Sequence, residues 1–255
     1  MARRRHRPHP YDAVVPPTNE HGQPIGVPVE WSAREPVGPV ELVGRWSRVE
    51  PLGRTHLDPL FRSLALESPE TVWTYLASGP FTDRAALWAV LRGLHDDPAS
   101  VPHALCLPDG RAVGMASYLR LDHRNGSVEV GWIAMSAELQ RTTAATEAMY
   151  LMARHVFDDL GYRRYEWKCD SLNEPSRRAA ARLGFTYEGT FRQAQVYKDR
   201  NRDTAWFSIT DAEWPAIRSA FEEWLDPANH DADGRQRSAL RARREPPPAH
   251  PPATS

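Results

Sequence analysis

The sequence has little cysteine and no cluster of metal-ligating side chains. Its two cysteines, Cys106 and Cys169, are far apart and form no CxxC pair, which argues against a disulfide framework or a zinc site. Each falls in an apolar, strand-like run, so we expect both to be reduced residues of the core. The ten histidines are scattered without metal-ligand spacing, and the sequence therefore predicts no metal.

Long apolar runs and a charge excess are missing as well. No apolar run approaches the roughly 20 residues of a membrane span, and no apolar segment follows the N-terminal arginines to make a secretory signal. The net charge of −1 gives no global field for nucleic acid or for an anionic membrane. We expect a cytoplasmic protein without a membrane partner. The basic run Arg3–Arg7 is most simply a solvated tail, with an RNA-associated protein as one alternative.

Composition divides the 255 residues into three parts. Residues 1–38 are rich in proline and charge, and we expect a partly disordered N-terminal extension. Residues 227–255 become arginine-rich and then proline-rich, which predicts a largely disordered C-terminal tail. Between them the sequence predicts one domain over 39–226.

Hydrophobic periodicity and turn residues predict an α+β domain with a mixed sheet. Asp109-Gly110 and Asn125-Gly126 separate three apolar runs and indicate two successive hairpins. Downstream, a strand–helix–strand order follows a helix whose apolar residues recur at i, i+3 and i+4. The expected strands are 40–50, 102–107, 112–121, 127–136, 164–170, 185–197 and 203–210. The expected helical segments are 55–66, 69–77, 83–95, 143–160, 173–183 and 212–225.

The most informative stretch is 129–147, where a buried strand, a short polar loop and the start of an apolar-striped helix follow one another. A helix start presents unpaired backbone N–H groups and the positive end of the helix dipole, which suits a phosphorylated ligand. The loop residues are Gln140 to Thr146, in the order Gln-Arg-Thr-Thr-Ala-Ala-Thr. The alternative is an ordinary helix start with Thr143 as its N-cap.

Two further positions carry chemistry. Glu129 lies in a run that is otherwise free of charge, which is costly unless the carboxylate is paired or functional. It is either a general base, a solvated side chain or the partner of an arginine such as Arg120. A second strand-to-helix junction begins at Asn173, with Pro175 in the first turn and Ser176 three residues after the asparagine.

Together these stretches resemble the acyl-CoA site of the GNAT superfamily of N-acetyltransferases. The family uses Gln/Arg-x-x-Gly-x-Gly/Ala before its central helix, and this chain departs from that pattern with Thr143 at the first glycine. Residues 162–178 and 189–193 are similar to the bacterial ribosomal-protein Nα-acetyltransferase branch (RimJ/RimL-like). The resemblance implies the GNAT fold, with a mostly antiparallel sheet flanked by helices and acyl-CoA in the cleft between splayed central strands.

The resemblance also implies a reaction and its residues. The donor is acetyl-CoA and the acceptor a primary amine, either a protein or peptide N-terminus, an amino acid or a small amine. Glu129 would be the base, acting directly or through a water. Ser176 or water would protonate the thiolate, since Ala180 stands where many relatives have a tyrosine. A non-catalytic acyl-CoA-binding or sensing protein is the rival interpretation, and either a monomer or a homodimer is compatible. The acyl-CoA contacts would be Ala134, Met135, Ser136, Gln140, Arg141, Thr142, Thr143, Ala144, Ala145, Thr146, Asn173 and Ser176.

The acceptor side has the weakest pattern. The family binds its amine opposite the CoA arm, which predicts a cleft flanked by residues 69–96 and by the turn 198–202. Trp73, Tyr75 and Phe81 would be its apolar walls.

Overall fold

The computed structural model describes residues 16–231 and 235–242 of the chain, which divides into two compact units, Met1–Ser32 and Ala33–Ser255. In the first unit, an isolated β-bridge joins Thr18 to Pro24. The side chain of Asn19 closes the turn between them by accepting hydrogen bonds from the backbone N–H groups of His21 and Gln23. The predicted basic tail Arg3–Arg7 and the final residues 243–255 lie outside the described residues.

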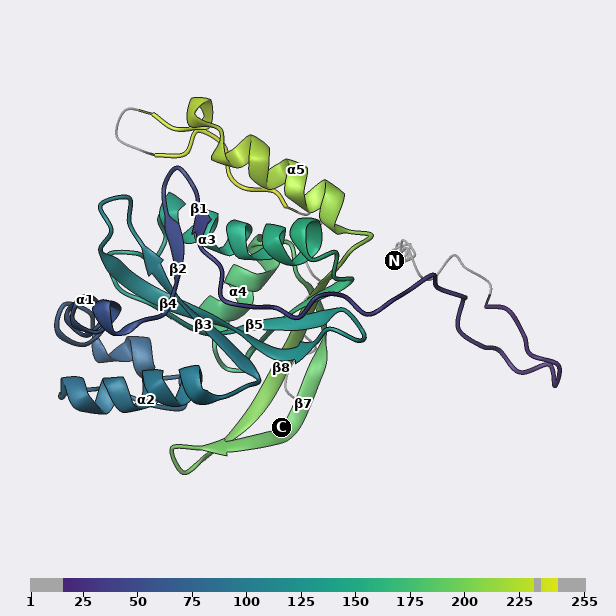
Figure 1. Ribbon diagram of the computed structural model, residues 1–255, viewed down its shortest axis with the longest axis horizontal. Coiled ribbons are helices and arrows are strands. Elements are labelled where there is room, and N and C mark those ends of the chain that lie inside the picture. Colours follow the sequence, from purple (N-terminus) through teal and green to yellow (C-terminus); the bar gives the residue numbers. More distant parts are fainter. Residues whose placement is uncertain (1–15, 232–234, 243–255) are drawn as a thin grey trace, which may run out of the picture. The chain divides into compact units, whose positions relative to one another are not determined.

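The second unit is built on one eight-stranded sheet with the order β1-β2-β3-β4-β5-β6-β8-β7 (Figure 1). Only the β5–β6 pair is parallel, and the other neighbours are antiparallel. This is the mixed, mostly antiparallel sheet that the sequence predicts. The strands are β1 Leu42–Val43, β2 Arg48–Pro51, β3 Ser100–Cys106, β4 Ala112–Asp122, β5 Ser127–Met135, β6 Arg164–Asp170, β7 Thr186–Tyr197 and β8 Arg200–Thr210.

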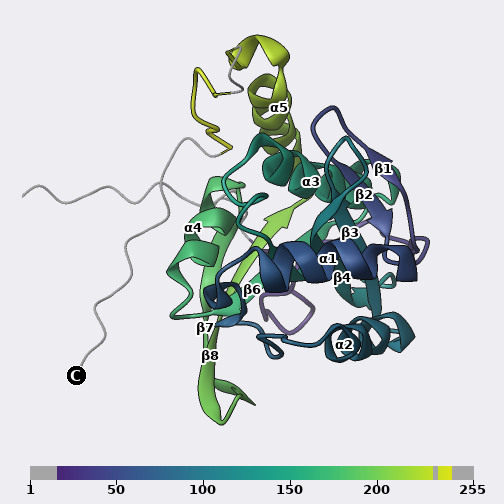
Figure 2. The ribbon, with the colours of Figure 1, turned by 90° about the vertical axis from the view of Figure 1, so that its left-hand side faces the viewer.

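Helices cover both faces of the sheet and create two hydrophobic cores (Figures 1 and 2). One face carries α3 (Thr143–Arg154, continued by the π-helical turn η4, His155–Asp159), α4 (Glu174–Arg182) and α5 (Trp214–Leu225). The other carries α1 (Leu57–Phe61) with η1 (Arg54–His56) and η2 (Arg62–Leu66), then η3 (Glu70–Trp73) and α2 (Arg84–Asp96). The last described helical turn is η5 (Pro227–Asn229). Within the described residues, no helix combines the length and apolar character needed to cross a bilayer.

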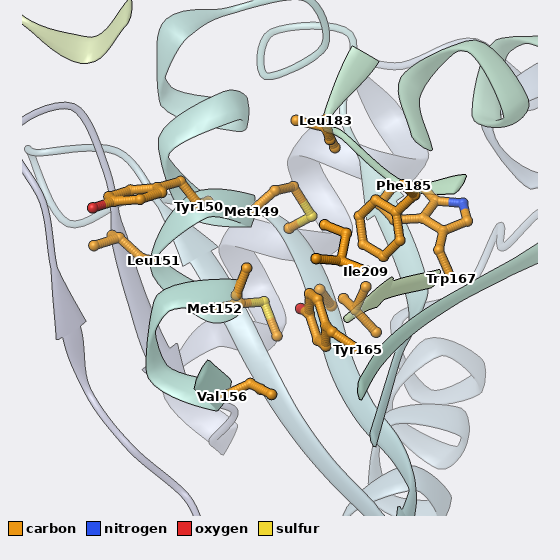
Figure 3. Close-up of a cluster of buried hydrophobic side chains, with 14 of the residues drawn as sticks. Met149, Tyr150, Leu151, Met152, Val156, Tyr165, Trp167, Leu183, Phe185 and Ile209 are labelled. Atoms are coloured by element: carbon orange, nitrogen blue, oxygen red, sulfur yellow. The ribbon is translucent and has the colours of Figure 1, made fainter. Parts of the chain in front are cut away.

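In the core under α3, the apolar face of the helix packs against the sheet. Met149, Met152 and Val156 point from one side of the helix toward Tyr165 and Trp167 of β6 (Figure 3). These side chains are at most 5% exposed, which agrees with the predicted apolar face of this helix. Further neighbours in the same cluster are Leu183, Phe185 and Ile209.

The two predicted hairpins are confirmed, and their glycines explain them. Gly110 and Gly126 have φ values of 86° and 63°, in the left-handed region that glycine adopts without a steric penalty. They connect β3 to β4 and β4 to β5. The chain therefore reaches β5, the strand that carries Glu129, by two local turns.

The single strand expected at 40–50 is wrong, because two short strands, β1 and β2, replace it. The turn between them is held by Glu147 of α3, which is 5% exposed. Its carboxylate accepts hydrogen bonds from Arg45 N (2.9 Å), Trp46 N (2.6 Å) and Ser47 Oγ (3.0 Å). A side chain at Gly44 would collide with the same carboxylate at 2.3 Å. The interruption of the strand is thus fixed by a residue one hundred positions away.

The expected domain boundaries are too narrow at both ends. Val37, Leu240 and Ala242 are 5–7% exposed and belong to the main core. At the C-terminal side, Trp224 Nε1 donates to Gln236 Oε1 at 2.9 Å, and His230 pairs with Gln236 in a β-bridge. Within the segment expected to be a largely disordered tail, His230, Leu240 and Ala242 are therefore buried against the domain.

Candidate active site

The central feature of the sheet is an opening between β5 and β6. The two strands pair only from Ser127–Arg164 to Val130–Trp167, although β5 continues to Met135 and β6 to Asp170. In the same region β5 contains a bulge against β4, and Trp132 has φ 50°. Bulges bend a strand and leave backbone groups unpaired. The outer edge of β5 after Val130 therefore offers N–H and C=O groups to a ligand in the opening.

The loop between β5 and α3 is ordered by its own polar side chains. Ser136 is 1% exposed, and its Oγ accepts from Leu139 N at 3.3 Å. Gln140 Nε2 donates to the carbonyl of Met135 at 2.8 Å. The sharp turn falls on Arg141, whose φ is 63°. These contacts leave the loop in a fixed shape in front of the first turn of α3.

The N-cap of α3 is Thr142, so the alternative with Thr143 as N-cap is wrong by one residue. Thr142 Oγ1 accepts from Ala145 N at 3.1 Å, and Thr143 is the first residue of the helix. Because Thr143 has a helical conformation, the departure from the family's glycine places no side chain in a left-handed backbone. Among the described residues no acceptor is found for the N–H groups of Thr143 and Ala144. These two donors remain available at the positive end of the helix.

Arg182 is a cation next to this helix start that the sequence analysis missed. It lies in the last turn of α4, and its Nη1 donates to Thr146 Oγ1 at 3.1 Å. Nothing local marks it, because an arginine near a helix C-terminus is ordinary chemistry. The contact brings a positive charge to the first turn of α3.

The second junction places Asn173 and Ser176 at the start of α4. Asn173 is the N-cap, and its Oδ1 accepts from Ser176 N at 3.1 Å. Ser176 Oγ in turn accepts from Trp167 Nε1 at 3.0 Å. Figure 3 shows this indole nitrogen pointing away from the packed side chains around it. Both predicted residues thus lie at the β6 side of the opening, with their backbone positions fixed by the helix cap.

Cys169 is a buried residue beside this junction, as expected. Burial raises the pKa of its thiol to about 11, and a hydrogen bond from Ser176 opposes the shift only partly. A thiol of that pKa is protonated at neutral pH and is a poor nucleophile. Cys106 is likewise buried and free.

Glu129 lies on β5 just before the opening, and its side chain is 7% exposed. Its neighbours Val128 and Val130 enter the core under α3, so the carboxylate is on the opposite face of the sheet. Oε2 forms an ion pair with Lys168 Nζ, and Arg120 Nε lies 4.0 Å from the same oxygen. The arginine contact considered from the sequence is therefore present, and the closer lysine was missed. The pKa of Glu129 is raised above its ordinary value, because burial outweighs the opposing effect of the Lys168 ammonium.

Gly131 is the residue that gives the Glu129 side chain its room. A Cβ at this position would lie 2.9 Å from Glu129 Oε1 and 2.7 Å from Leu119 Cδ1. Real Cβ atoms essentially never approach other atoms below 3.0 Å. The absence of a side chain at 131 therefore sets the position of the carboxylate.

The expected acceptor residues lie close together, but two of them are core residues. Trp73 and Phe81 are 1% and 9% exposed, and their rings meet edge to face at 4.9 Å in the second core. Tyr75 is nearer the surface, and its hydroxyl donates to the carbonyl of Leu172 at 3.1 Å. Lys198 Nζ donates to the carbonyl of Trp73 at 2.7 Å. The segments 69–96 and 198–202 are thus in contact, while the role of these residues toward an acceptor stays a prediction.

One group of potential metal ligands is found within the described residues. Glu50, His56 and Cys106 offer ligand atoms within 4.8 Å of one another. However, His56 Nδ1 accepts from Gly53 N at 3.1 Å, so the neutral ring carries its proton on Nε2. That nitrogen faces Glu50 Oε2 at 3.2 Å as a hydrogen-bond donor. The arrangement is explained by a histidine–carboxylate contact, in which neither ring nitrogen of His56 offers a free lone pair to a metal.

Comparison with known proteins identifies the class. The family described as "Acetyltransferase (GNAT) domain" matches residues 48–186, which includes the β5–β6 opening and the starts of α3 and α4. The match covers more than half of the chain. The chain belongs to the GNAT acetyltransferase family.

Individual relatives agree with this assignment. The crystal structure of a GCN5-related N-acetyltransferase from Brucella melitensis is 42% identical, with a TM-score of 0.81, over 83% of this chain and 97% of that one. A Bacillus subtilis (strain 168) protein named "Putative ribosomal N-acetyltransferase YdaF" is 29% identical over 146 residues, 56% of this chain and 78% of its own length. A spermidine N-acetyltransferase from Vibrio cholerae, solved with CoA and spermine, is 15% identical over 66% of this chain and 98% of that one, with a TM-score of 0.54, and shares the fold.

Proposed function

We propose that this protein transfers the acetyl group of acetyl-CoA to a primary amine by direct attack in a ternary complex. The observation that carries the proposal is the convergence of three features at one opening in the sheet. These are the separation of β5 from β6, the unpaired N–H groups at the start of α3, and the buried carboxylate of Glu129. Family membership supports acetyl transfer, and the geometry suggests which step of the reaction each residue serves.

Anion binding is the first role. The pyrophosphate of the donor would accept from the N–H groups of Thr143 and Ala144, with Arg182 as an adjacent cation. Asn173 would bind the pantetheine arm at the other side of the opening through its side-chain amide. Both sites use the starts of helices whose positions are fixed by caps. The donor would then lie along the free edge of β5.

Proton transfer is the second role. An alkylammonium has no lone pair, so Glu129 would take its proton before the nitrogen attacks the thioester carbonyl. The N–C bond forms and the C–S bond breaks; the nitrogen then releases a second proton, which the departing CoA thiolate takes up through Ser176 or water, so that the serine regains its own proton. Ser176 Oγ accepts a hydrogen bond from Trp167 Nε1, and its own O–H faces Cys169, so it would have to turn from Cys169 toward the thiolate to donate. The products are an N-acetyl amide and free CoA.

The class of acceptor is proposed from the name of a relative and from local charge. The printed name of the Bacillus subtilis relative refers to ribosomal acetylation, which favours a protein or peptide N-terminus over a small amine. The cations Lys198, Arg200 and Arg202 at the β7–β8 turn disfavour a polycationic acceptor at that wall. A non-catalytic acyl-CoA sensor remains the rival function, since it would use the same cofactor contacts.

Thiol release from acetyl-CoA, measured with purified protein and a panel of peptides, amino acids and small amines, tests the proposal. We expect saturable release with at least one acceptor class. Saturable CoA binding without release from any acceptor would support the sensor instead.

The cofactor site is tested separately by Thr143→Asp, with Thr143→Ser as its control. Close like charges in a partly desolvated site repel by several kcal/mol. We expect the Kd for CoA to rise by about 100-fold or more in the Asp variant and to change little in the Ser variant. Unchanged affinity of a folded Asp variant, measured by calorimetry, would place the cofactor elsewhere.

A further inference from the structure

Glu129 belongs to a chain of alternating charges whose residues come from four strands, β4, β5, β6 and β7. Lys168 of β6 binds Glu129. Arg120 of β4 lies 4.0 Å from Glu129 and 3.8 Å from Glu166. Arg164 continues the chain with contacts of 2.6 Å to Glu166 and to Glu188 of β7. The indole ring of Trp206 on β8 lies beneath the two cations that face Glu129.

The two cations around Glu129 have different environments. The Lys168 side chain is 14% exposed, and its Nζ lies 4.5 Å from the centre of the Trp206 ring. The Arg120 side chain is 58% exposed, and its guanidinium lies 5.3 Å from the same ring. Coulombic interaction weakens with distance and with exposure to water. Lys168 is therefore the dominant positive charge acting on Glu129.

The choice of lysine at this position is informative because lysine is rare in this protein. Of the 32 basic residues, only Lys168 and Lys198 are lysines. Lysine is a compact ammonium whose proton affinity responds to burial, whereas arginine is larger and always charged. Burial lowers the pKa of Lys168, and the Glu129 carboxylate opposes this effect. When two oppositely charged groups are both buried, each of them stays ionised only while the other is also ionised.

We propose that Lys168 is a positioning residue that keeps Glu129 ionised, and fixes its carboxylate at the edge of the opening, at neutral pH. This inference rests on the proposed function, because it names the residue that controls the charge of the proposed base, Glu129. The ion pair engages Oε2 and leaves Oε1 beside Gly131 for the acceptor's proton. Without the ammonium, the buried carboxylate would take up a proton at a higher pH and could not accept one from the substrate.

The test compares the pH dependence of kcat/KM in the wild type with that in Lys168→Met and Lys168→Arg. Methionine keeps much of the side-chain volume and removes the charge, whereas arginine keeps the charge. Loss of an adjacent opposite charge raises a carboxyl pKa by about 1–3 units. The ascending limb of Lys168→Met should therefore move up by at least about one pH unit, with activity recovering at high pH. The limb of Lys168→Arg should stay near that of the wild type.

Arg120→Met is the graded control, because it removes the more exposed cation. Its limb should move less than that of Lys168→Met. A loss of activity in Lys168→Met that is equal at all pH values would reduce Lys168 to a structural role. A shift in Arg120→Met as large as that in Lys168→Met would also overturn the inference. Thermal unfolding of each variant confirms that folded proteins are compared.

A second readout separates this inference from the proposed function. The side-chain carboxyl carbon of Glu129 can be titrated by 13C NMR, with its signal assigned by Glu129→Gln. We expect its midpoint to lie higher in Lys168→Met than in the wild type, whether or not an acceptor is known. A wild type without thiol release would refute the function while leaving this titration valid. An unchanged midpoint in an active enzyme would refute only the role of Lys168.

Discussion

Two buried glutamates, Glu129 and Glu147, show how different partners give the same side chain different uses. Glu147 accepts three hydrogen bonds from a turn on neighbouring strands, two of them from backbone N–H groups that cannot move away. Glu129 instead faces two side-chain cations on one oxygen, and its other oxygen lies beside a glycine. Both side chains lie almost entirely out of solvent. Burial alone therefore does not identify a reactive carboxylate, whereas the kind of partner distinguishes the structural carboxylate of Glu147 from the proposed base Glu129.

The largest expected effect comes from removing the proposed proton acceptor, Glu129. Glu129→Gln keeps the shape of the side chain but cannot take the acceptor's proton. Loss of a general base typically costs about 10²–10⁴ in rate. The pH–rate profile should lose its ascending limb, while CoA affinity measured by calorimetry stays close to that of the wild type. A Gln variant within a factor of about two of the wild-type rate would return Glu129 to a structural role.

The same substitution at the other glutamate should affect stability instead of chemistry. In Glu147→Gln one oxygen becomes an amide N–H that faces backbone donors at the β1–β2 turn. A buried polar group left unsatisfied costs about 1–3 kcal/mol. We expect the free energy of unfolding to fall by about 2–3 kcal/mol, measured by urea denaturation. Activity of the folded fraction at 25 °C should be retained, and a selective loss of kcat with unchanged stability would contradict the comparison.

A smaller effect is expected when the position of the Glu129 carboxylate is shifted without altering its chemistry. Gly131→Ala places a methyl group against Glu129 Oε1 and Leu119, both ends of flexible side chains. The stability cost should be small, but a displacement of about 1 Å at a reacting group can cost up to roughly 100-fold in rate. We expect kcat/KM to fall by roughly 10–100-fold. Gly38→Ala, where a Cβ meets nothing within 4 Å, is the control and should match the wild type.

The sequence predicts those parts of the fold that depend on neighbouring residues. The hairpins at Asp109-Gly110 and Asn125-Gly126 follow from local turn chemistry, and the α3 stripe follows from helical periodicity. The division of β1 from β2 could not be predicted, since it depends on Glu147 in a distant helix. Packing of Leu240 and Ala242 against the core was missed for the same reason, as two small apolar residues in an arginine-rich stretch give no periodic signal.

The candidate site likewise contains residues that the sequence predicts and residues that it does not. Glu129 stands out because it is a charged residue in an apolar run, whereas Asn173 and Ser176 are found through the resemblance of this helix start to the family's motif. Lys168 and Arg182 show neither signal, since they reach the site only through the parallel β5–β6 register and the packing of α4 beside α3. Thr142 and Thr143 were confused because either hydroxyl can cap a helix, and only the backbone conformation decides between them.

The order of strands in the sheet also determines when the domain can be completed during synthesis. β8 lies between β6 and β7, so β6 has its outer edge unpaired until residue 210 has been made. β7 emerges first, yet it joins the sheet only through β8. A nascent chain that ends with the family match at residue 186 would expose the edge of β6, and an unpaired strand edge can recruit other chains. β8, which is made late in synthesis, therefore covers the edge of β6 after β6 has paired with β5.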